Sequence, residues 1–391
     1  MVTGAYFPEL SGGGLQCRTM IHVLGEWFDF EVLTTCTDPK LPPVQVVEGT
    51  LVTRVYVDVS RPMTKVAAAC RTVMFFLRRH ATFEAVHLHG FSQKSVLVIL
   101  LAKLLGKRVI ITIHTAGTDE PDGVRRLGGL AYWCYSRADR FLAISEAIAA
   151  NYRAAGLPES RLRIVPNGVD TDRFRPAAAG EREQCCRDLG LDPSLRWIAF
   201  VGFFSREKNP DVLFDAWLAL SPSVREGTGL VFAGATESKY HEVDPALAQR
   251  LRADATRLGL QERVRFLGEV PDIERVYKVA DVLAMPSTRE AFGMVLVEAM
   301  ASGLPVVATR IEGVTDAIVD EGVTGILAPP RDAAAWTGAL TRILTDPMGA
   351  RAMGGYARRA VDERYGFGTS ARRWRAIYGE LTPSGIPYTS V

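Results

Sequence analysis

The chain alternates short, continuously apolar segments with longer helical stretches, and this alternation limits its possible folds more than any other feature. Strands that are apolar throughout are typical of parallel sheets covered by helices on both faces. We therefore predict an α/β protein built on parallel strands. Eight such apolar strands are predicted, over residues 107–114, 139–145, 162–168, 196–202, 229–235, 264–270, 281–287 and 304–310, in addition to a short first strand over residues 1–4.

A break in this alternation predicts two domains. The chain has 391 residues, which exceeds the size of one ordinary core. Proline, an alanine-glycine run and charged residues interrupt the pattern over residues 170–183. We predict two doubly wound Rossmann-like domains facing across a cleft, over residues 1–178 and 179–362, and a disordered tail over 383–391.

Composition excludes several classes of protein. The chain is 48% hydrophobic and 23% charged, as in soluble globular proteins, and its net charge of +2 gives no argument for nucleic-acid binding. None of the six cysteines is paired at a metal-ligand spacing, and no signal peptide is evident, so we expect a reduced, cytoplasmic protein. We expect no metal and no cofactor.

Two apolar helices bear on membrane contact. Residues 95–106 are too short to span a bilayer and include Lys103, so we predict a buried helix there. Residues 63–80 mix apolar with basic side chains. That helix fits either an anionic membrane surface, which implies peripheral contact at the inner face, or a core-facing helix with a basic outer edge.

Polar residues gather at predicted strand ends in the first half of the chain. Tyr6 precedes a glycine run in which Gly13 and Gly14 open a helix, either as a flexible turn or as a close approach to a phosphate or sugar. His114 ends a strand and is followed by Asp119 and Glu120. A histidine at this position is either structural or faces a ligand at the sheet edge.

Two cations follow a strand end in the second half. Arg206 and Lys208 lie between the strand that ends at Gly202 and a helix expected to start at Asn209-Pro210. They suit a diphosphate or form a solvated charged turn.

The segment 287–303, "STREAFGMVLVEAMASG", contains two glutamates separated by an apolar, glycine-containing run. We predict that a helix begins near Phe292-Gly293, so that Glu290 lies in the preceding loop and Glu298 nearly two turns inside. The free N–H groups and the positive dipole end of the first turn lie between them. One carboxylate can bind hydroxyls at each end of a ligand, with a diphosphate between, which is the layout of a nucleotide-sugar.

Several of these segments together resemble one enzyme family. The stretches "VPNGVDTDRF", "GFFSREKN", "FLGEV", "PSTREAFGMVLVEAMASGLPVVAT" and "GVTGILAPP" are similar to the family 4 retaining glycosyltransferases of GT-B fold. The resemblance covers most of the chain. It implies a nucleotide-sugar donor held mainly by the second domain, no metal requirement, and a C-terminal helix over residues 363–382 that crosses back to the first domain.

The resemblance also implies roles for single residues. Glu290 contacts hydroxyls of the donor sugar, Glu298 binds the ribose diol, Lys208 neutralises the diphosphate and His114 faces the transferred sugar, with Arg206 as a further cation. Tyr6, Asp119 and Glu120 lie on the acceptor side. The remaining donor-binding residues are Gly13, Gly14, Gly202, Leu267, Gly268, Ala291, Phe292, Gly293, Met294 and Val295.

The sequence departs from the family pattern in two places. Phe203 stands where many members have an arginine, which is why Arg206 enters the list. The first predicted strand, residues 1–4, is shorter than usual, so either the strand is short or the chain starts upstream. A third segment, Asp170-Thr171-Asp172, matches the metal-binding pattern of GT-A transferases, but its position predicts a cap or turn.

The sequence therefore predicts a retaining hexosyltransferase that uses a UDP- or GDP-sugar, with Glu290 not acting as a nucleophile. The acceptor is open among glycans, lipid-linked glycans and small molecules. The alternatives are a nucleotide-sugar epimerase of the same fold and a sugar-binding protein without catalysis. An NAD-linked dehydrogenase fits least, because the spaced glycine fingerprint is missing.

Overall fold

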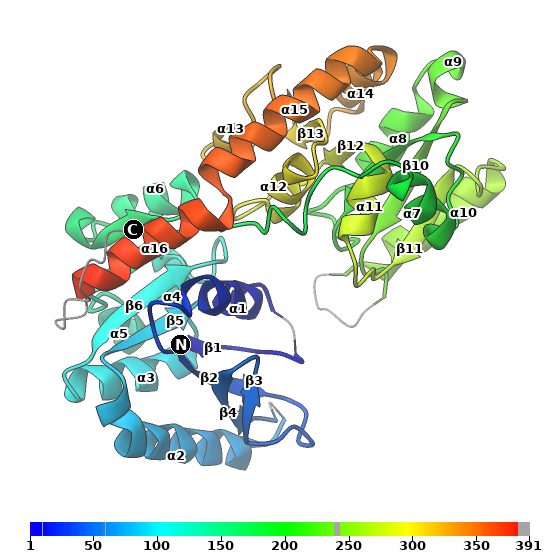
Figure 1. The fold of residues 1–391 in the computed structure, drawn as a ribbon. Helices are drawn as coiled ribbons and strands as arrows, with labels where there is room; N and C mark the ends of the chain where they lie inside the picture. Colours follow the sequence, from blue (N-terminus) through cyan, green and yellow to red (C-terminus); the bar gives the residue numbers. More distant parts are fainter. Residues whose placement is uncertain (10, 59, 238–242, 382–391) are drawn as a thin grey trace. The chain divides into compact units, whose positions relative to one another are not determined.

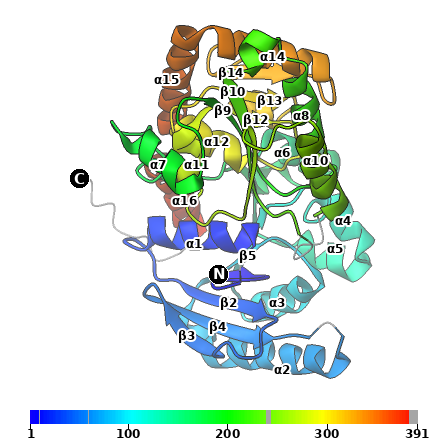
Figure 2. The same cartoon turned by 90° about the vertical axis from the view of Figure 1, so that its right-hand side faces the viewer.

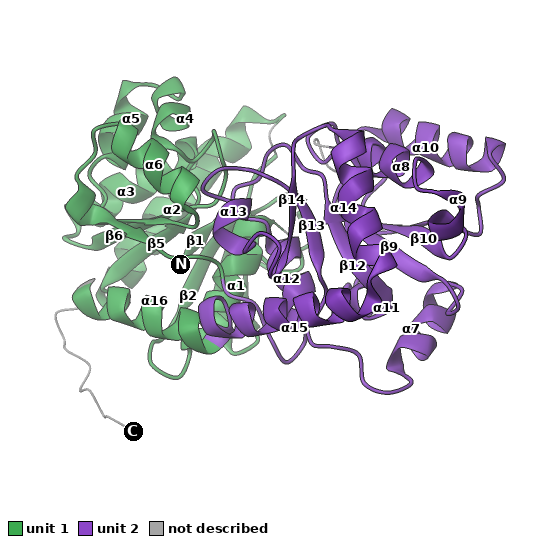
Figure 3. Cartoon of the chain, turned by 90° about the horizontal axis from the view of Figure 1, so that it is seen from above, with its two compact units in different colours: residues 1–167, 368–391 green, residues 168–367 purple. Residues whose placement is uncertain are grey.

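The computed structural model describes residues 1–9, 11–58, 60–237 and 243–381. It divides the chain into two compact units, shown in Figure 3: unit 1 comprises residues 1–167 and 368–391, and unit 2 comprises residues 168–367. The predicted tail over residues 383–391 lies outside the described residues.

Unit 1 is built on an eight-stranded sheet, visible in Figure 1, in the order β3-β4-β2-β1-β5-β6-β7-β8. Neighbouring strands run parallel, except that β3 pairs with β4 in antiparallel fashion. The strands are β1 Val2–Thr3, β2 Glu31–Cys36, β3 Val44–Val47, β4 Thr50–Tyr56, β5 Ala85–His89, β6 Arg108–Ile113, β7 Arg140–Ala143 and β8 Leu162–Ile164.

The last helix of the chain completes unit 1. Trp374 and Tyr378 of α16 pack with Met20 of α1 against Ile110 and neighbouring strand residues, and Figure 2 shows α1 and α16. The unit therefore joins both ends of the chain in one core. Its helices are α1 Gly12–Leu24, α2 Pro62–Arg79, α3 Gln93–Leu104, α4 Pro121–Arg126, α5 Gly129–Tyr135, α6 Glu146–Ala154 and α16 Phe367–Leu381, with 3₁₀ turns at His80–Thr82 and Glu159–Arg161.

Unit 2 is built on a six-stranded sheet in the order β11-β10-β9-β12-β13-β14, and all of its strand pairs are parallel. Trp217 and Trp336 are fully buried in the apolar core of this unit. The strands are β9 Arg196–Val201, β10 Thr228–Ala233, β11 Val264–Gly268, β12 Ala280–Met285, β13 Val306–Thr309 and β14 Gly325–Ala328. The helices are α7 Glu181–Leu189, α8 Pro210–Leu218, α9 Pro222–Arg225, α10 Pro245–Arg257, α11 Glu274–Val279, α12 Met294–Ala301, α13 Thr315–Ile318, α14 Ala333–Thr345 and α15 Pro347–Arg364.

Each sheet has one point at which the strand order reverses. In unit 1 the chain moves outward from β1 to one side and later continues on the other side from β5; in unit 2 the corresponding strands are β9 and β12. Ligands of open α/β sheets bind beyond the carboxyl ends of the strands at such points. The segments after β1, β5, β9 and β12 are therefore where a site is expected.

The eight strands predicted from the sequence are confirmed, with shifts of a few residues at their ends. The predicted helices 63–80 and 95–106 correspond to α2 and α3. Strands β2, β3, β4, β5 and β14 were not predicted. In β2 and β4 polar side chains interrupt the apolar pattern, although Thr34 and Arg54 are buried. Across the described ranges, no helix is both long enough and apolar enough to cross a bilayer.

The connecting segment packs with unit 2 rather than unit 1. The two units change at residue 168, so the boundary expected at residue 178 lies inside unit 2. Arg173 forms an ion pair of 2.8 Å with Glu274, and the Phe174 ring packs on Tyr277. These contacts hold the segment against α11.

Candidate active site

In unit 2, glycines hold the ends of three neighbouring strands against one another. The Gly202 N–H donates to the Ala233 carbonyl (2.9 Å), and the Gly234 N–H donates to the Gly268 carbonyl (2.7 Å). A Cβ on Gly234 would lie 2.0 Å from the Gly202 carbonyl oxygen, so no larger residue fits there. All three glycines have positive φ. Gly234 is a site residue that the sequence analysis missed, and its place at the end of a predicted strand was the available signal.

The loop after β9 is tied to the loop after β12. Asn209 adopts a left-handed conformation (φ 46°) at the start of α8, and its side-chain amide donates to the Pro286 carbonyl at 3.2 Å. The Thr288 N–H donates to the Glu207 carbonyl at 2.7 Å. The two loops at the switch point therefore form one hydrogen-bonded unit.

This arrangement brings Lys208 and Glu290 together. Their Nζ and Oε1 atoms are 2.6 Å apart, and their side chains are 28% and 13% exposed. Because both groups are mostly removed from water, each charge depends on the other for compensation. Removing either partner leaves an unbalanced charge at the end of β9 or β12.

The helix that follows starts beside this pair. Gly293 (φ 99°) precedes α12, whose first residue is Met294, and the buried Phe292 ring packs edge-on against Tyr365 with centroids 5.7 Å apart. Glu298 is the fifth residue of α12, so it lies just over one turn inside and not nearly two. Ala291 and Val295 are half-buried on either side of the helix start.

Glu298 projects from α12 toward α11. Its Oε2 accepts a hydrogen bond from the Tyr277 hydroxyl at 2.7 Å. Burial raises the pKa of the Glu298 carboxyl to about 7, and the Tyr277 hydrogen bond and the Arg173 charge oppose that rise only partly. Leu267 lies on β11 and is half-buried.

The structure does not group Arg206 with this site. Its side chain is 89% exposed and lies 3.4 Å from Asp244 at the start of α10. The Arg206 guanidinium is directed to a helix cap, whereas Lys208, two residues later, turns toward Glu290. The cation of this loop that meets a site carboxylate is therefore Lys208.

In unit 1 the strand ends carry a ladder of neutral histidines. The rings of His87 and His89 stack with centroids 4.5 Å apart, and His89 stacks on His114 at 5.3 Å. His89 Nδ1 and His114 Nε2 are 3.1 Å apart, and the two ring nitrogens of His87 bond to Tyr378 and Thr112. Burial lowers the pKa of His114 to about 4 and those of the other two well below their usual value.

The glycine run packs directly on this ladder. A Cβ on Gly13 would lie 3.3 Å from the His89 carbonyl oxygen, and one on Gly14 only 2.3 Å from the Ala5 carbonyl oxygen. Ser11 caps α1 by accepting the Gly14 N–H at 3.0 Å. The packing of α1 within unit 1 thus accounts for Gly14 without a ligand.

The two acids after His114 hold their own loop. Asp119 is buried and accepts the N–H groups of Phe91 and Thr115 at 3.0 and 3.1 Å. Glu120 is also buried; it accepts the Gly117 N–H at 2.6 Å and the Asn151 amide at 2.8 Å. Both acids therefore stabilise the loop by hydrogen bonds within unit 1. We do not assign them direct contacts with an acceptor.

Tyr6, the third residue expected on the acceptor side, lies in a core cluster. It is 3% exposed and packs with Cys17, Ile21 and Val32. Burial raises the pKa of its hydroxyl to about 12. This position disfavours contact with an acceptor.

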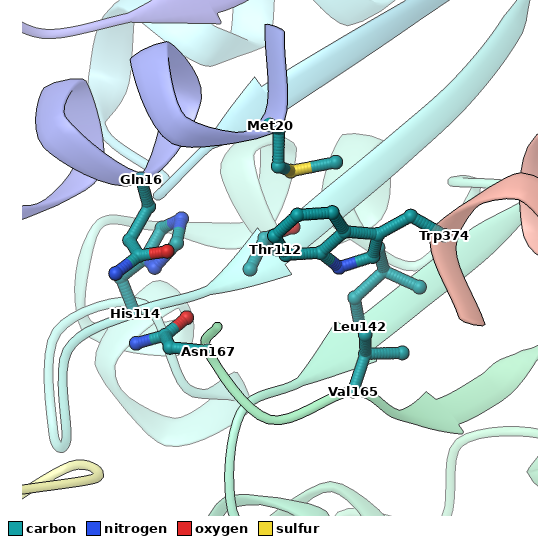
Figure 4. Close-up of a pocket in the computed structure, with 8 residues that line it drawn as sticks. All are labelled: Gln16, Met20, Thr112, His114, Leu142, Val165, Asn167 and Trp374. Atoms are coloured by element: carbon teal, nitrogen blue, oxygen red, sulfur yellow. The ribbon is translucent and has the colours of Figure 1, made fainter. Parts of the chain in front are cut away.

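A small pocket opens beside His114 in unit 1 (Figure 4). Figure 4 shows Asn167 and Gln16 near His114, with the Trp374 indole farther along the lining. The pocket brings together the segment that follows β8, through Val165 and Asn167, and α16, through Trp374. Its lining residues are Gln16, Met20, Thr112, His114, Leu142, Val165, Asn167 and Trp374.

The Asp170-Thr171-Asp172 segment forms a turn, which confirms the sequence prediction. Asp170 Oδ1 accepts the N–H groups of Asp172 and Arg173, each at 3.0 Å. Among the described residues, no group of three or more His, Cys, Asp or Glu side chains could hold a metal ion.

The fold and this site together define a class of protein. Two doubly wound parallel sheets, with a lysine and two glutamates around a helix N-terminus at one switch point, are the architecture of a GT-B glycosyltransferase. Residues 11–173 match the model of glycosyltransferase family 4, and residues 182–360 match that of glycosyl transferases group 1. The chain belongs to the family 4 glycosyltransferases of GT-B fold.

Curated relatives support the same assignment. A D-inositol 3-phosphate glycosyltransferase of Corynebacterium urealyticum is 32% identical over 330 residues, which cover 81% of this chain and 76% of that protein. One from Nocardia farcinica is 31% identical over 379 residues, covering 90% and 80%. The chain is thus a glycosyltransferase by membership of its family.

Solved structures show the fold. An Anabaena protein, HepE, in complex with UDP and glucose superposes with a TM-score of 0.78 at 18% identity, covering 97% of this chain and 99% of that one. Sucrose-phosphate synthase of Thermosynechococcus elongatus gives a TM-score of 0.77 at 22% identity, with coverage of 97% and 98%.

Proposed function

We propose that this chain is a retaining, metal-independent glycosyltransferase that moves a hexosyl group from a UDP- or GDP-sugar to a hydroxyl of a small polar acceptor. The observation that carries the proposal is the Lys208–Glu290 pair, 2.6 Å apart, at the switch point beside the start of α12. The pair supplies one cation for a diphosphate and one carboxylate for sugar hydroxyls.

Lys208 and the start of α12 stabilise the leaving group. As the bond between the anomeric carbon and the phosphate oxygen breaks, negative charge grows on the diphosphate. A fixed cation and the positive end of a helix placed on that charge lower the barrier. No metal is needed for this role, since Lys208 already brings a full positive charge to the site.

Glu290 keeps Lys208 in place until a donor arrives. In the structure it neutralises the lysine. When the diphosphate takes the lysine's charge, the Glu290 carboxylate is available to accept hydrogen bonds from sugar hydroxyls. The acceptor oxygen then bonds to the anomeric carbon on the face that the leaving group departs from, and its proton passes to a donor phosphate oxygen, so Glu290 forms no covalent bond.

Glu298 is suited to a diol at the other end of the donor. It lies four residues beyond the first residue of α12, which places it about 6 Å along the helix. We assign the ribose hydroxyls to it. We place the base of the donor beside Leu267 and Gly268, at the end of β11.

The relatives favour a particular donor and acceptor. The curated relatives at 31% and 32% identity are named D-inositol 3-phosphate glycosyltransferases, and HepE was solved with UDP and glucose. We therefore place a phosphorylated cyclic polyol first among acceptors and a UDP-sugar first among donors. Glycans and lipid-linked glycans remain as alternatives for the same assay.

Product analysis tests this function. The protein is incubated with UDP-glucose or GDP-mannose, with and without inositol 3-phosphate, in buffer containing a chelator. A new glycoside with the anomeric configuration of the donor supports the proposal. A sugar isomer formed from donor alone would indicate the epimerase, and binding without turnover across the acceptor classes would indicate a sugar-binding protein.

We further propose that helix α2 makes peripheral contact with the cytoplasmic face of a membrane. Its apolar residues Met63, Val66 and Leu77 are 77%, 57% and 58% exposed, and Arg78 and Arg79 end the helix. Such a surface can insert apolar groups beside anionic headgroups. Sedimentation with vesicles with and without anionic lipid tests it, and absence of salt-sensitive binding would exclude it.

A further inference from the structure

A hydrogen bond from Tyr277 fixes the orientation of the Glu298 carboxyl. The Tyr277 hydroxyl donates to Oε2 of Glu298 at 2.7 Å, across the gap between α11 and α12. The tyrosine side chain is 1% exposed, so it has no room to swing away. A bond to one carboxylate oxygen fixes rotation about the last side-chain bond and therefore sets the direction in which the other oxygen faces.

The segment that enters unit 2 supports this tyrosine. The Phe174 ring packs on the Tyr277 ring with centroids 5.8 Å apart, and the Arg173 guanidinium lies 5.1 Å from the centre of the Phe174 ring. Arg173 also pairs with Glu274, three residues before Tyr277 on α11. Arg173 and Phe174, the last two residues of the segment 165–174, thus both contact α11.

Helix α15 anchors the same segment to α12. Arg358 donates to the carbonyls of Phe174 and Ala301 at 2.9 and 2.6 Å, and to that of Thr171 at 3.0 Å. Ala301 is the last residue of α12. One arginine therefore fixes the position of Phe174 relative to the helix that carries Glu298.

We propose that Tyr277 is a positioning residue for the sugar-nucleotide site: held by Phe174, it aims the Glu298 carboxylate at the ribose diol of the donor. This inference rests on the proposed function, since it assigns the ligand of Glu298. It also gives Arg173 and Phe174 a role, because these two residues act on the site through Tyr277.

The groups around Glu298 set the pKa of its carboxyl, so the role of Tyr277 can be measured through the pH dependence of donor binding. Tyr277 and Glu274 face Glu298 from α11, Arg173 from the entering segment, and Arg358 lies on α15 at the far end of α12. Burial holds the pKa of Glu298 at about 7, and the Tyr277 bond keeps it from rising further. An ionised carboxylate accepts stronger hydrogen bonds than a protonated one, so donor affinity is expected to increase as the pH rises through 7.

The test is calorimetric titration from pH 5.5 to 9 with UDP-glucose or GDP-mannose, whichever binds wild type more tightly. A sugar diphosphate is chosen because its esterified phosphates do not titrate in this range, whereas a terminal phosphate does. Tyr277→Phe keeps the buried ring and removes only the hydroxyl. We expect it to move the midpoint of the affinity rise upward by about one pH unit and to weaken binding at pH 7 by several-fold.

Three variants complete the design. Glu298→Gln should abolish the rise near pH 7. Tyr152→Phe removes a buried hydroxyl that donates to the Pro158 carbonyl in unit 1 and should leave the profile as in wild type. Phe174→Leu should weaken binding by a smaller factor than Tyr277→Phe.

The outcomes separate the two claims. If wild type binds neither sugar nucleotide, the proposed function fails. If wild type binds with a midpoint near pH 7 and Tyr277→Phe has the same midpoint and affinity, the function stands and the positioning role of Tyr277 is overturned.

Discussion

The two units carry different side chains near the switch points of their sheets. Those of unit 1 are uncharged histidines, whereas those of unit 2 include an ion pair. In unit 1 the strand ends hold His87, His89 and His114, which burial keeps uncharged near neutral pH. In unit 2 they hold the ion pair Lys208–Glu290 and a carboxyl whose pKa is about 7. A doubly wound sheet therefore fixes where a site lies, and the loop residues alone decide its charge.

The difference extends to the glycines. The glycines of α1 allow this helix to pack closely on the strand ends of unit 1, and Ser11 caps the helix. Gly293 precedes α12 without a side chain that could cap it, so the start of α12 keeps its affinity for an anion. We therefore assign stabilisation of the leaving group's charge to unit 2.

The largest effect is expected at Lys208. Lys208→Met removes the cation that meets the leaving diphosphate and leaves Glu290 uncompensated, so turnover should fall about 10²–10³-fold. Initial rates of transfer at saturating acceptor measure it. Lys107→Met, a lysine beside the Phe83 ring in unit 1, is the matched control. A Lys208 variant with near-normal turnover would remove the lysine from the site.

Because of Glu298, the free energy of unfolding of unit 2 should decrease as the pH rises. The folded pKa of Glu298, about 7, exceeds the ordinary glutamate value of 4.5. The folded state therefore binds the proton more tightly, and the stabilisation, complete below 4.5, is lost as the pH rises through 7. Between pH 5 and 8 the loss should be about 2–3 kcal/mol.

Urea unfolding at both pH values measures this loss. Glu298→Gln should be less sensitive to pH than wild type by that amount. Glu262→Gln, a change at a side chain that is 91% exposed, serves as the control. Parallel curves for wild type and Glu298→Gln would show that the carboxyl titrates normally.

The glycine run separates packing from ligand binding. Gly14→Ala should destabilise the protein by about 1–3 kcal/mol, because its Cβ would lie 2.3 Å from a backbone oxygen. Gly12→Ala places its Cβ where no atom lies within 4 Å and should be neutral or slightly stabilising. Equal unfolding midpoints for the two variants would contradict the packing explanation.

The smallest effect is expected from the histidines, with the opposite sign to Glu298. The folded pKa of His114, about 4, lies below the ordinary histidine value of 6.5. Stability is therefore complete above 6.5 and is lost as the pH falls toward 4, by about 1 kcal/mol for such a ring at pH 5.5.

Unfolding of wild type and His89→Gln at pH 7.5 and 5.5 tests the ladder. The variant should lose less stability on acidification, whereas His80→Gln, at an exposed position, should behave as wild type. An identical loss in His89→Gln would mean that the ring is protonated in the folded protein.

The sequence predicted the continuously apolar strands, for a physical reason. Fully buried parallel strands are apolar throughout, and Lys208, Glu290 and Glu298 stand at positions that follow directly from strand ends and a helix start. The role of Asp119 and Glu120 was not predictable, since loop acids that bind their own backbone resemble ligand contacts in sequence. The same holds for Tyr277, whose partner is 21 residues away.

The most direct test of the central claim is calorimetric titration of wild type, Lys208→Met and Glu298→Gln with UDP-glucose and GDP-mannose at pH 8, with Gly12→Ala as control. We expect wild type and Gly12→Ala to bind one of the two donors with equal affinity, and the other two variants to lose about tenfold or more in affinity. Unchanged affinity in both Lys208→Met and Glu298→Gln would contradict the placement of the donor in unit 2.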